Sequence, residues 1–228
     1  DANWVDNAFC QKANYCAEGY NTKASDLAKE SPMFCTSAFA SVTKDGAPFF
    51  AQCLGNGSDA QKNRQTGPHE YFHWVQQANV DMSKVPDWFL EGSADYFGDA
   101  LGSWTGKGVP STMDSMQHES SKNWVEQDLC DLRLPTIESI VKCFKFTYAS
   151  PPPKPGDRWV TAHVSYYMGS QATEAMIAVK GLSAFKAFLK DLQGKDFDAT
   201  FAKHYGLTVD EFYPKVAKYV LAMYNAGR

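Results

Sequence analysis

Five consecutive residues, His69-Glu70-Tyr71-Phe72-His73, have the types and spacing of a metal-binding helix. Residues four apart on a helix lie on the same face, so the two imidazoles can bind one metal ion. Glu70 follows the first histidine and can reach a water molecule on that metal, where a carboxylate acts as general base. The segment therefore predicts a zinc site with His69 and His73 as ligands and Glu70 as a catalytic residue.

A catalytic zinc site needs a third protein ligand, and Glu91 is the candidate. Glu91 follows His73 by 18 positions, which is enough for a helix, a reversing loop and a return helix. A histidine six residues after His73 is excluded as the third ligand, because position 79 is Asn79. We expect one zinc ion per chain, held by His69, His73 and Glu91. The alternative is that Glu91 is an ordinary surface carboxylate on an amphipathic helix.

The segments around these residues resemble the gluzincin clan of zinc metallopeptidases, and more narrowly the compact peptidase-MA-like domains. Residues 88–96 match the pattern W-x-x-E-G-x-A-x-Y/F, and residues 166–174 match Y-x-x-G-x-x-A-x-E. Residues 206–212 are similar to the closing turn and helix of those domains, so the resemblance covers about 65–105 and 160–225. It implies a zincin-like fold and hydrolysis of peptide bonds by a zinc-activated water, with Glu70 as general base. The aminopeptidase segment G-x-M-E-N is absent, so exopeptidase action is not implied.

Two further site residues are expected around the metal. Asp95 follows Glu91 by one helical turn, and we expect it to accept a hydrogen bond from His69, since zinc-bound histidines commonly donate to a carboxylate. The resemblance implies that Tyr166 faces the zinc and stabilises the oxyanion, which makes it a second catalytic residue. Tyr167 points about 100° away on the same helix, and His163 could assist whichever tyrosine faces inward. The alternatives are a solvent-exposed Asp95 and a tyrosine packed in the core.

The elements that position these residues are mostly helical. Pro68 suits the first position of a helix, and a second helix opens near Pro86. The C-terminal third is expected to be helical over about 160–179 and 182–193, then from a cap at Asp196 to near Gly206, and again after Thr208. Glu211 lies three residues after Thr208, which predicts a capping box.

The N-terminal part carries the only strand signal. Residues 47–54 form a short apolar run between turn signals, which predicts a strand, whereas residues 26–43 are ambiguous and residues 105–135 are expected to be loop-rich. The predicted class is α+β and mainly α: a zincin-like catalytic domain with a small N-terminal sheet, an HExxH helix and a helical C-terminal part. We expect one domain over 1–228, with 1–66 mixed and 67–228 mostly helical.

The composition is that of an ordinary globular protein. The 228 residues are 44% hydrophobic and 21% charged, with a formal net charge of −4. An acidic chain with four arginines does not favour nucleic acid as a partner, because binding to phosphates needs a basic surface. No apolar run approaches the length that a membrane span needs.

The cysteines indicate an oxidising compartment. Their number is even and no CxxC pair occurs, which favours three disulfides over a thiolate zinc site. We expect Cys130 to pair with Cys143 and the other four cysteines to link the N-terminal part. Buried free thiols are the alternative. The six cysteines are Cys10, Cys16, Cys35, Cys53, Cys130 and Cys143. The protein is accordingly expected to be secreted or otherwise extracytoplasmic.

Three function classes remain. The leading one is a secreted zinc metallopeptidase that acts on a protein or peptide. The second is a non-catalytic secreted domain that zinc stabilises and that binds a partner. Against it stands Glu70, which a purely structural metal site would not need. The third is a disulfide-rich binding module with a coincidental HExxH segment, for which the Glu91 segment would be a second coincidence.

Overall fold

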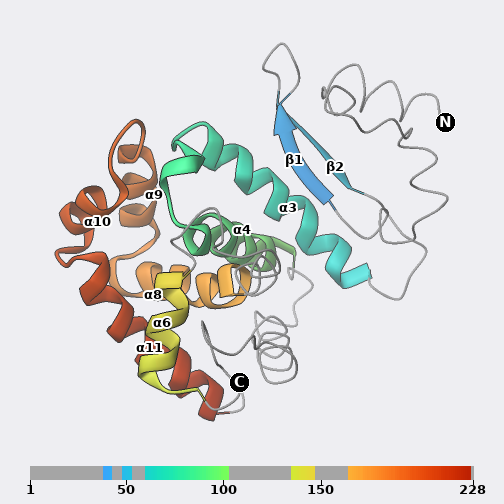
Figure 1. The fold of residues 1–228 in the computed structure, drawn as a ribbon. Helices are drawn as coiled ribbons and strands as arrows, with labels where there is room; N and C mark the ends of the chain where they lie inside the picture. Colours follow the sequence, from blue (N-terminus) through green and yellow to red (C-terminus); the bar gives the residue numbers. More distant parts are fainter. Residues whose placement is uncertain (1–37, 43–47, 53–59, 103–134, 147–163, 227–228) are drawn as a thin grey trace, which may run out of the picture.

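The structure is a computed structural model that describes residues 38–42, 48–52, 60–102, 135–146 and 164–226 (Figure 1). Strands β1 (Ala38–Val42) and β2 (Pro48–Gln52) pair antiparallel, with Ala40 opposite Phe50. The helices are α3 (Ala60–Gln77), α4 (Asp87–Gly102), α6 (Ile137–Phe146), α8 (Gly169–Lys180), α9 (Leu182–Asp191), α10 (Phe197–Tyr205) and α11 (Val209–Asn225). A 3-10 turn, η3 (Met82–Lys84), lies between α3 and α4, and a π-helical turn, η4 (Val164–Met168), leads into α8.

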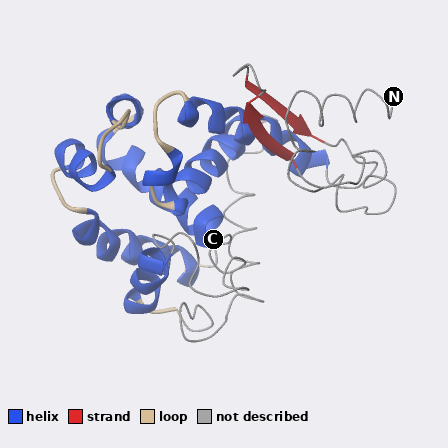
Figure 2. Ribbon diagram, turned by 45° about the horizontal axis from the view of Figure 1, so that its top comes forward, coloured by secondary structure: helices blue, strands red, loops and turns tan. Residues whose placement is uncertain are grey.

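The predicted α+β class is wrong, because the described core is all-α. Every buried hydrophobic residue of that core lies in a helix or in a segment that connects two helices. The two strands lie against α3, on the side away from α4 (Figures 1 and 2). A single antiparallel pair buries little surface of its own. The apolar run at 47–54 predicted a strand, and β2 lies there, but within the described ranges no further strand joins the pair.

The predicted start of the first helix is also wrong. α3 begins at Ala60, and Pro68 lies inside it rather than at its first position. Proline has no N–H for the helical ladder and usually ends or kinks a helix, which is why the sequence indicated a boundary there. A second departure is α6, a helix that was not predicted although its apolar residues Ile137, Ile140 and Phe144 have helical spacing. Of residues 105–135, which were expected to be loop-rich, all but the last lie outside the described residues.

The helix ends of the C-terminal part confirm their predictions. The Asp196 side chain accepts from the Ala199 N–H and caps α10, which ends at Gly206 with a left-handed φ of 74°. At the start of α11 the Thr208 hydroxyl accepts from the Glu211 N–H, and the Glu211 carboxylate accepts from the Thr208 N–H. Local side chains thus satisfy the backbone groups that a helix leaves open at its ends.

The centre of the helical part is a group of buried rings that we call the aromatic cluster. Neighbouring ring centroids lie 4.7–6.3 Å apart, mostly edge-to-face or tilted, as aromatic pairs prefer. Its members are Trp88 and Phe89 of α4, Phe144 of α6, Phe188 of α9, Phe197, Phe201 and Tyr205 of α10, and Phe212 and Tyr213 of α11. The cluster fixes α4 against the C-terminal helices.

Candidate metal centre

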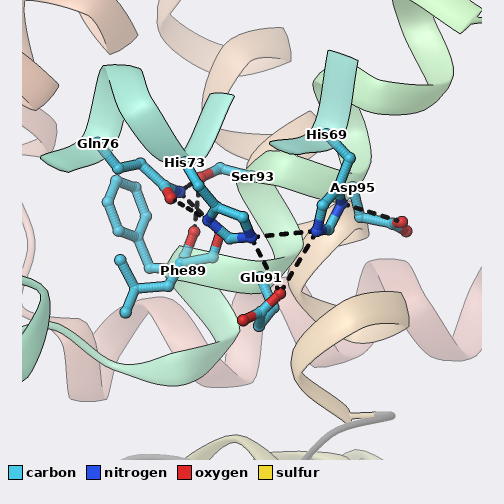
Figure 3. Close-up of polar contacts among 8 residues, drawn as sticks. His69, His73, Gln76, Phe89, Glu91, Ser93 and Asp95 are labelled. Atoms are coloured by element: carbon cyan, nitrogen blue, oxygen red, sulfur yellow. Dashed lines mark hydrogen bonds and ion pairs between the residues drawn. The ribbon is translucent and has the colours of Figure 1, made fainter. Parts of the chain in front are cut away.

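Two antiparallel helices bring the three predicted ligands together. α3 carries His69 and His73 one turn apart, η3 reverses the chain, and α4 carries Glu91 (Figure 3). The Nε2 atoms of the two histidines lie 3.1 Å apart. The Oε2 atom of Glu91 lies 3.6 Å from Nε2 of His69 and 3.4 Å from Nε2 of His73. Three possible ligand atoms therefore form a nearly equilateral triangle.

This triangle fits a zinc ion. Tetrahedral zinc with bonds of 2.0–2.1 Å separates its ligand atoms by about 3.3–3.4 Å, and the observed edges of 3.1, 3.4 and 3.6 Å span that value. Oε2 of Glu91 is buried and has no hydrogen-bond partner. A buried carboxylate oxygen without a donor is costly, and a cation at the centre of the triangle would satisfy it.

Two of the proposed ligands, His73 and Glu91, shift each other's pKa values. Burial opposes protonation of His73, but the adjacent Glu91 carboxylate and its negative charge outweigh burial and raise the His73 pKa. Burial would raise the pKa of Glu91, yet the His69 and His73 imidazoles beside it outweigh burial and hold that pKa well below its usual range. Glu91 is thus ionised without metal, while a cation would compete with a proton for the same histidine nitrogens.

Glu70, the predicted base, is buried on α3 next to His69, with 6% of its surface exposed. Its negative charge contributes to the raised pKa values of both His73 and Tyr166. The Glu70 carboxylate is therefore close enough to His73 and Tyr166 for its charge to act on both.

Tyr166 approaches the site from η4. Its ring stacks on that of His69, with centroids 5.6 Å apart and planes 23° from parallel. Burial raises the pKa of Tyr166 far above its usual value, and the charge and hydrogen bond of Glu91 raise it further. Of the two neighbouring tyrosines, the structure brings Tyr166 against a predicted ligand. His163, the possible assistant, lies outside the described residues.

Asp95 faces the other nitrogen of His69, at a distance longer than a hydrogen bond. Its Oδ1 atom lies 3.8 Å from Nδ1 of His69. Burial raises the pKa of Asp95, and the nearby charges of Asp99 and Glu91 raise it further. The predicted hydrogen bond from His69 therefore stays a prediction, although the two groups are adjacent.

A close crossing of α4 and α8 sets the position of η4. A Cβ atom added to Gly92 would lie 2.1 Å from the backbone carbon of Gly169, and one added to Gly169 would lie 2.1 Å from the Trp88 carbonyl oxygen. No side chain fits between the helices at this point. Since Tyr166 lies three residues before Gly169, the crossing brings it within reach of His69. Both glycines are part of the patterns that carry the family resemblance, but nothing in the sequence indicated that they touch.

Sequence reasoning missed Gln76, which is fully buried behind His73. Its Oε1 atom lies 2.7 Å from Nδ1 of His73 (Figure 3). The signal that could have found it is its place three residues after a ligand, on the same face of the helix.

Of the histidines and cysteines outside this site, the structure describes His204 and Cys143. His204 lies on α10, where its Nε2 atom is 3.0 Å from an Asp191 oxygen. His118 lies outside the described residues, as do Cys10, Cys16, Cys35, Cys53 and Cys130. Cys143 is fully buried in α6 and is disulfide-bonded. The predicted pairings themselves stay predictions.

No family model, no curated protein and no solved structure matches the chain. Among the described helices, none has the length and apolar character needed to cross a bilayer.

Proposed function

We propose that this chain is a zinc-dependent metallopeptidase of the gluzincin type, with His69, His73 and Glu91 as metal ligands. The observation that carries the proposal is the triangle of ligand atoms, with edges of 3.1, 3.4 and 3.6 Å, beside a buried glutamate. When bound, zinc supplies a Lewis acid that polarises a peptide carbonyl and lowers the pKa of a water molecule.

Glu70 is the general base in this proposal. It accepts a proton from the attacking water and later delivers that proton to the leaving amine. Its burial beside His69 supports this role, because the carboxylate is shielded from bulk solvent yet close enough to affect His73 and Tyr166 electrostatically.

Tyr166 is the proposed donor to the oxyanion that develops on the substrate carbonyl. A hydroxyl stabilises that charge only while it keeps its proton. Burial and the Glu91 charge, which raise the pKa of Tyr166, support a protonated hydroxyl. The stacking of its ring on His69 supports a position next to the ligand triangle.

The proposal is tested by metal content and by proteolysis together. We expect dialysed protein to hold one zinc ion per chain and to cleave fluorescein-labelled casein until 1,10-phenanthroline is added. Glu70→Gln should keep its zinc but lose activity by roughly 10² or more, as expected for a lost general base.

Three results would contradict parts of this proposal. A zinc content near zero that added zinc does not restore rejects the metal site. Bound zinc without hydrolysis of casein or of a proteome-derived peptide library, in wild type as in Glu70→Gln, favours the non-catalytic zinc-stabilised binding domain. Full activity in Glu70→Gln removes Glu70 from the mechanism.

We also propose that the protein works in an oxidising, extracytoplasmic compartment. The even number of cysteines and the disulfide-bonded Cys143 support this. Titration of the denatured, unreduced protein with a thiol reagent should find almost no free thiol, and two or more free thiols per chain would contradict the proposal.

A further inference from the structure

Gln76 links the two helices that carry the metal ligands. It lies on α3, one turn after His73, and no part of it is exposed. Its Oε1 atom is 2.7 Å from Nδ1 of His73, and its Nε2 atom donates to the Leu90 carbonyl oxygen at 2.7 Å and to the Ser93 hydroxyl at 2.8 Å (Figure 3). One amide thus joins a histidine of α3 to two residues of α4 that flank Glu91.

The direction of these hydrogen bonds is fixed from the α4 side. A backbone carbonyl can only accept, so the amide nitrogen of Gln76 must face Leu90. The Ser93 hydroxyl donates to the Phe89 carbonyl oxygen at 2.6 Å, which leaves Ser93 as an acceptor for the same nitrogen. The oxygen of Gln76 must therefore face His73, and Nδ1 of His73 must be the atom that carries hydrogen.

That protonation pattern is the one a metal ligand needs. A neutral imidazole with hydrogen on Nδ1 has its lone pair on Nε2, the atom that points into the ligand triangle. The Phe89 and Leu90 carbonyls thus fix which atoms of Ser93 and Gln76 donate and which accept. Through Gln76 they also fix which nitrogen of His73 carries hydrogen and which is free to bind a metal.

We propose that Gln76 is a positioning residue of the metal centre, which sets the tautomer of His73 and fixes the α4 backbone next to Glu91. This inference rests on the proposed zinc site. Gln76 touches neither metal nor substrate in this role, and it acts through two of the three ligands. A residue that only filled the core would affect folding without changing the tautomer of His73.

Zinc affinity, measured by competition with a chromophoric chelator, is the first test. Gln76→Met keeps the approximate side-chain volume but removes the hydrogen bonds, and we expect it to weaken zinc binding roughly 10–100-fold. Ser93→Ala removes one acceptor and keeps both the His73 and the Leu90 contacts, so a loss of less than about tenfold is expected. Gln77→Met, at the neighbouring exposed position, is the matched control and should bind zinc like wild type.

The tautomer of His73 is the second test, and it needs neither metal nor activity. Long-range ¹H–¹⁵N spectra of zinc-free wild-type protein, recorded where His73 is neutral, should show hydrogen on Nδ1. Gln76→Met should lose this preference. Gln76→Glu keeps an acceptor for Nδ1 and should retain the preference for hydrogen on that atom. This variant provides the tautomer measurement if the methionine variant does not fold.

The outcomes separate this inference from the proposed function. Wild-type protein that binds no zinc rejects the metal site, whatever Gln76 does. Wild-type protein that binds zinc while folded Gln76→Met binds it equally well rejects the positioning role alone. A zinc-free wild type with the His73 hydrogen on Nε2 also rejects that role.

Discussion

The two faces of α4 carry different kinds of side chain: aromatic rings on one and carboxylates on the other. Trp88 and Phe89 pack into the aromatic cluster, where both rings are fully buried and the Trp88 N–H donates to the Tyr213 hydroxyl. Glu91 and Asp95, on the face toward α3, bring carboxylates close together beside two histidines. On the first face the Trp88 N–H has a hydrogen-bond partner, whereas the second holds a buried carboxylate oxygen without a donor.

This difference separates residues that stabilise the fold from the proposed metal ligands. Burying a Phe side chain contributes about 1.5–3 kcal/mol, and an aromatic pair adds about 0.5–1.5 kcal/mol beyond its area. A buried polar atom without a partner costs about 1–3 kcal/mol. Burial in the aromatic cluster can therefore offset the free-energy cost of the proposed metal centre, where the possible ligand atoms of His69, His73 and Glu91 lie together. Substitutions on the two sides should accordingly separate folding from metal binding.

The largest effect on folding is expected in the aromatic cluster, which contains none of the proposed ligands. Phe201 is fully buried and packs on Phe188, Tyr205 and Phe212, all from the C-terminal helices. Phe201→Ala should lower the free energy of unfolding by about 3–5 kcal/mol in urea titrations, through lost burial and a cavity. The zinc affinity of the folded fraction should not change. The exposed Val179 gives the matched control, Val179→Ala, and a parallel loss of zinc affinity in Phe201→Ala would break the separation of the two sides.

The next largest effect is expected from Tyr166. Tyr166→Phe should lower kcat by roughly 10–10³-fold, the size of one lost oxyanion donor, while zinc content and Tm stay near wild type. Tyr167→Phe is the control from the neighbouring position. If Tyr167→Phe is the impaired variant, the donor is the other tyrosine; if both remain active, neither serves the oxyanion.

Asp95 should affect metal binding but not folding. Asp95→Asn should weaken zinc affinity roughly 10–100-fold if Asp95 orients His69 in the metal-bound protein. The same change removes one of the carboxylates that crowd this face of α4, so the metal-free protein should be no less stable. Zinc titration and thermal unfolding of the metal-free variant measure the two effects, and a loss of stability with unchanged affinity would reverse the assignment.

The smallest effect is expected on the exposed side of the aromatic cluster. Asp191 accepts from Lys195, Lys203 and His204, and these hydrogen bonds hold its pKa well below its usual range. A lowered folded pKa contributes stability above the unfolded value, near 3.9 for Asp, which is lost as the pH falls through the folded pKa.

Acidification below about pH 4 should therefore remove a small increment of stability from the wild-type protein. Asp191→Asn lacks this increment at every pH, so the two proteins should become equally stable in acid. The difference between the two urea midpoints at pH 7 should also shrink in high salt, because the charges are exposed. An Asp191→Asn midpoint equal to that of wild type at pH 7 and low salt would show that these ion pairs contribute nothing.

The sequence alone determined the features that depend on neighbours along the chain. His69 and His73 share a helix face because they are four residues apart, and the caps at Asp196 and Thr208 formed where local hydrogen bonding predicted them. The return helix that carries Glu91 followed from the length of chain after His73.

Only the tertiary structure decided what depends on contacts between distant segments. The class is all-α because the helices pack on one another rather than on a sheet, and propensity cannot reveal which elements join the core. The approach of Tyr166 to His69 depends on the crossing of Gly92 and Gly169, residues 77 positions apart. The proposed role of Gln76 depends on the Leu90 carbonyl and the Ser93 hydroxyl of α4, which no local pattern indicates. Spacing places residues on a face, but packing decides what that face meets.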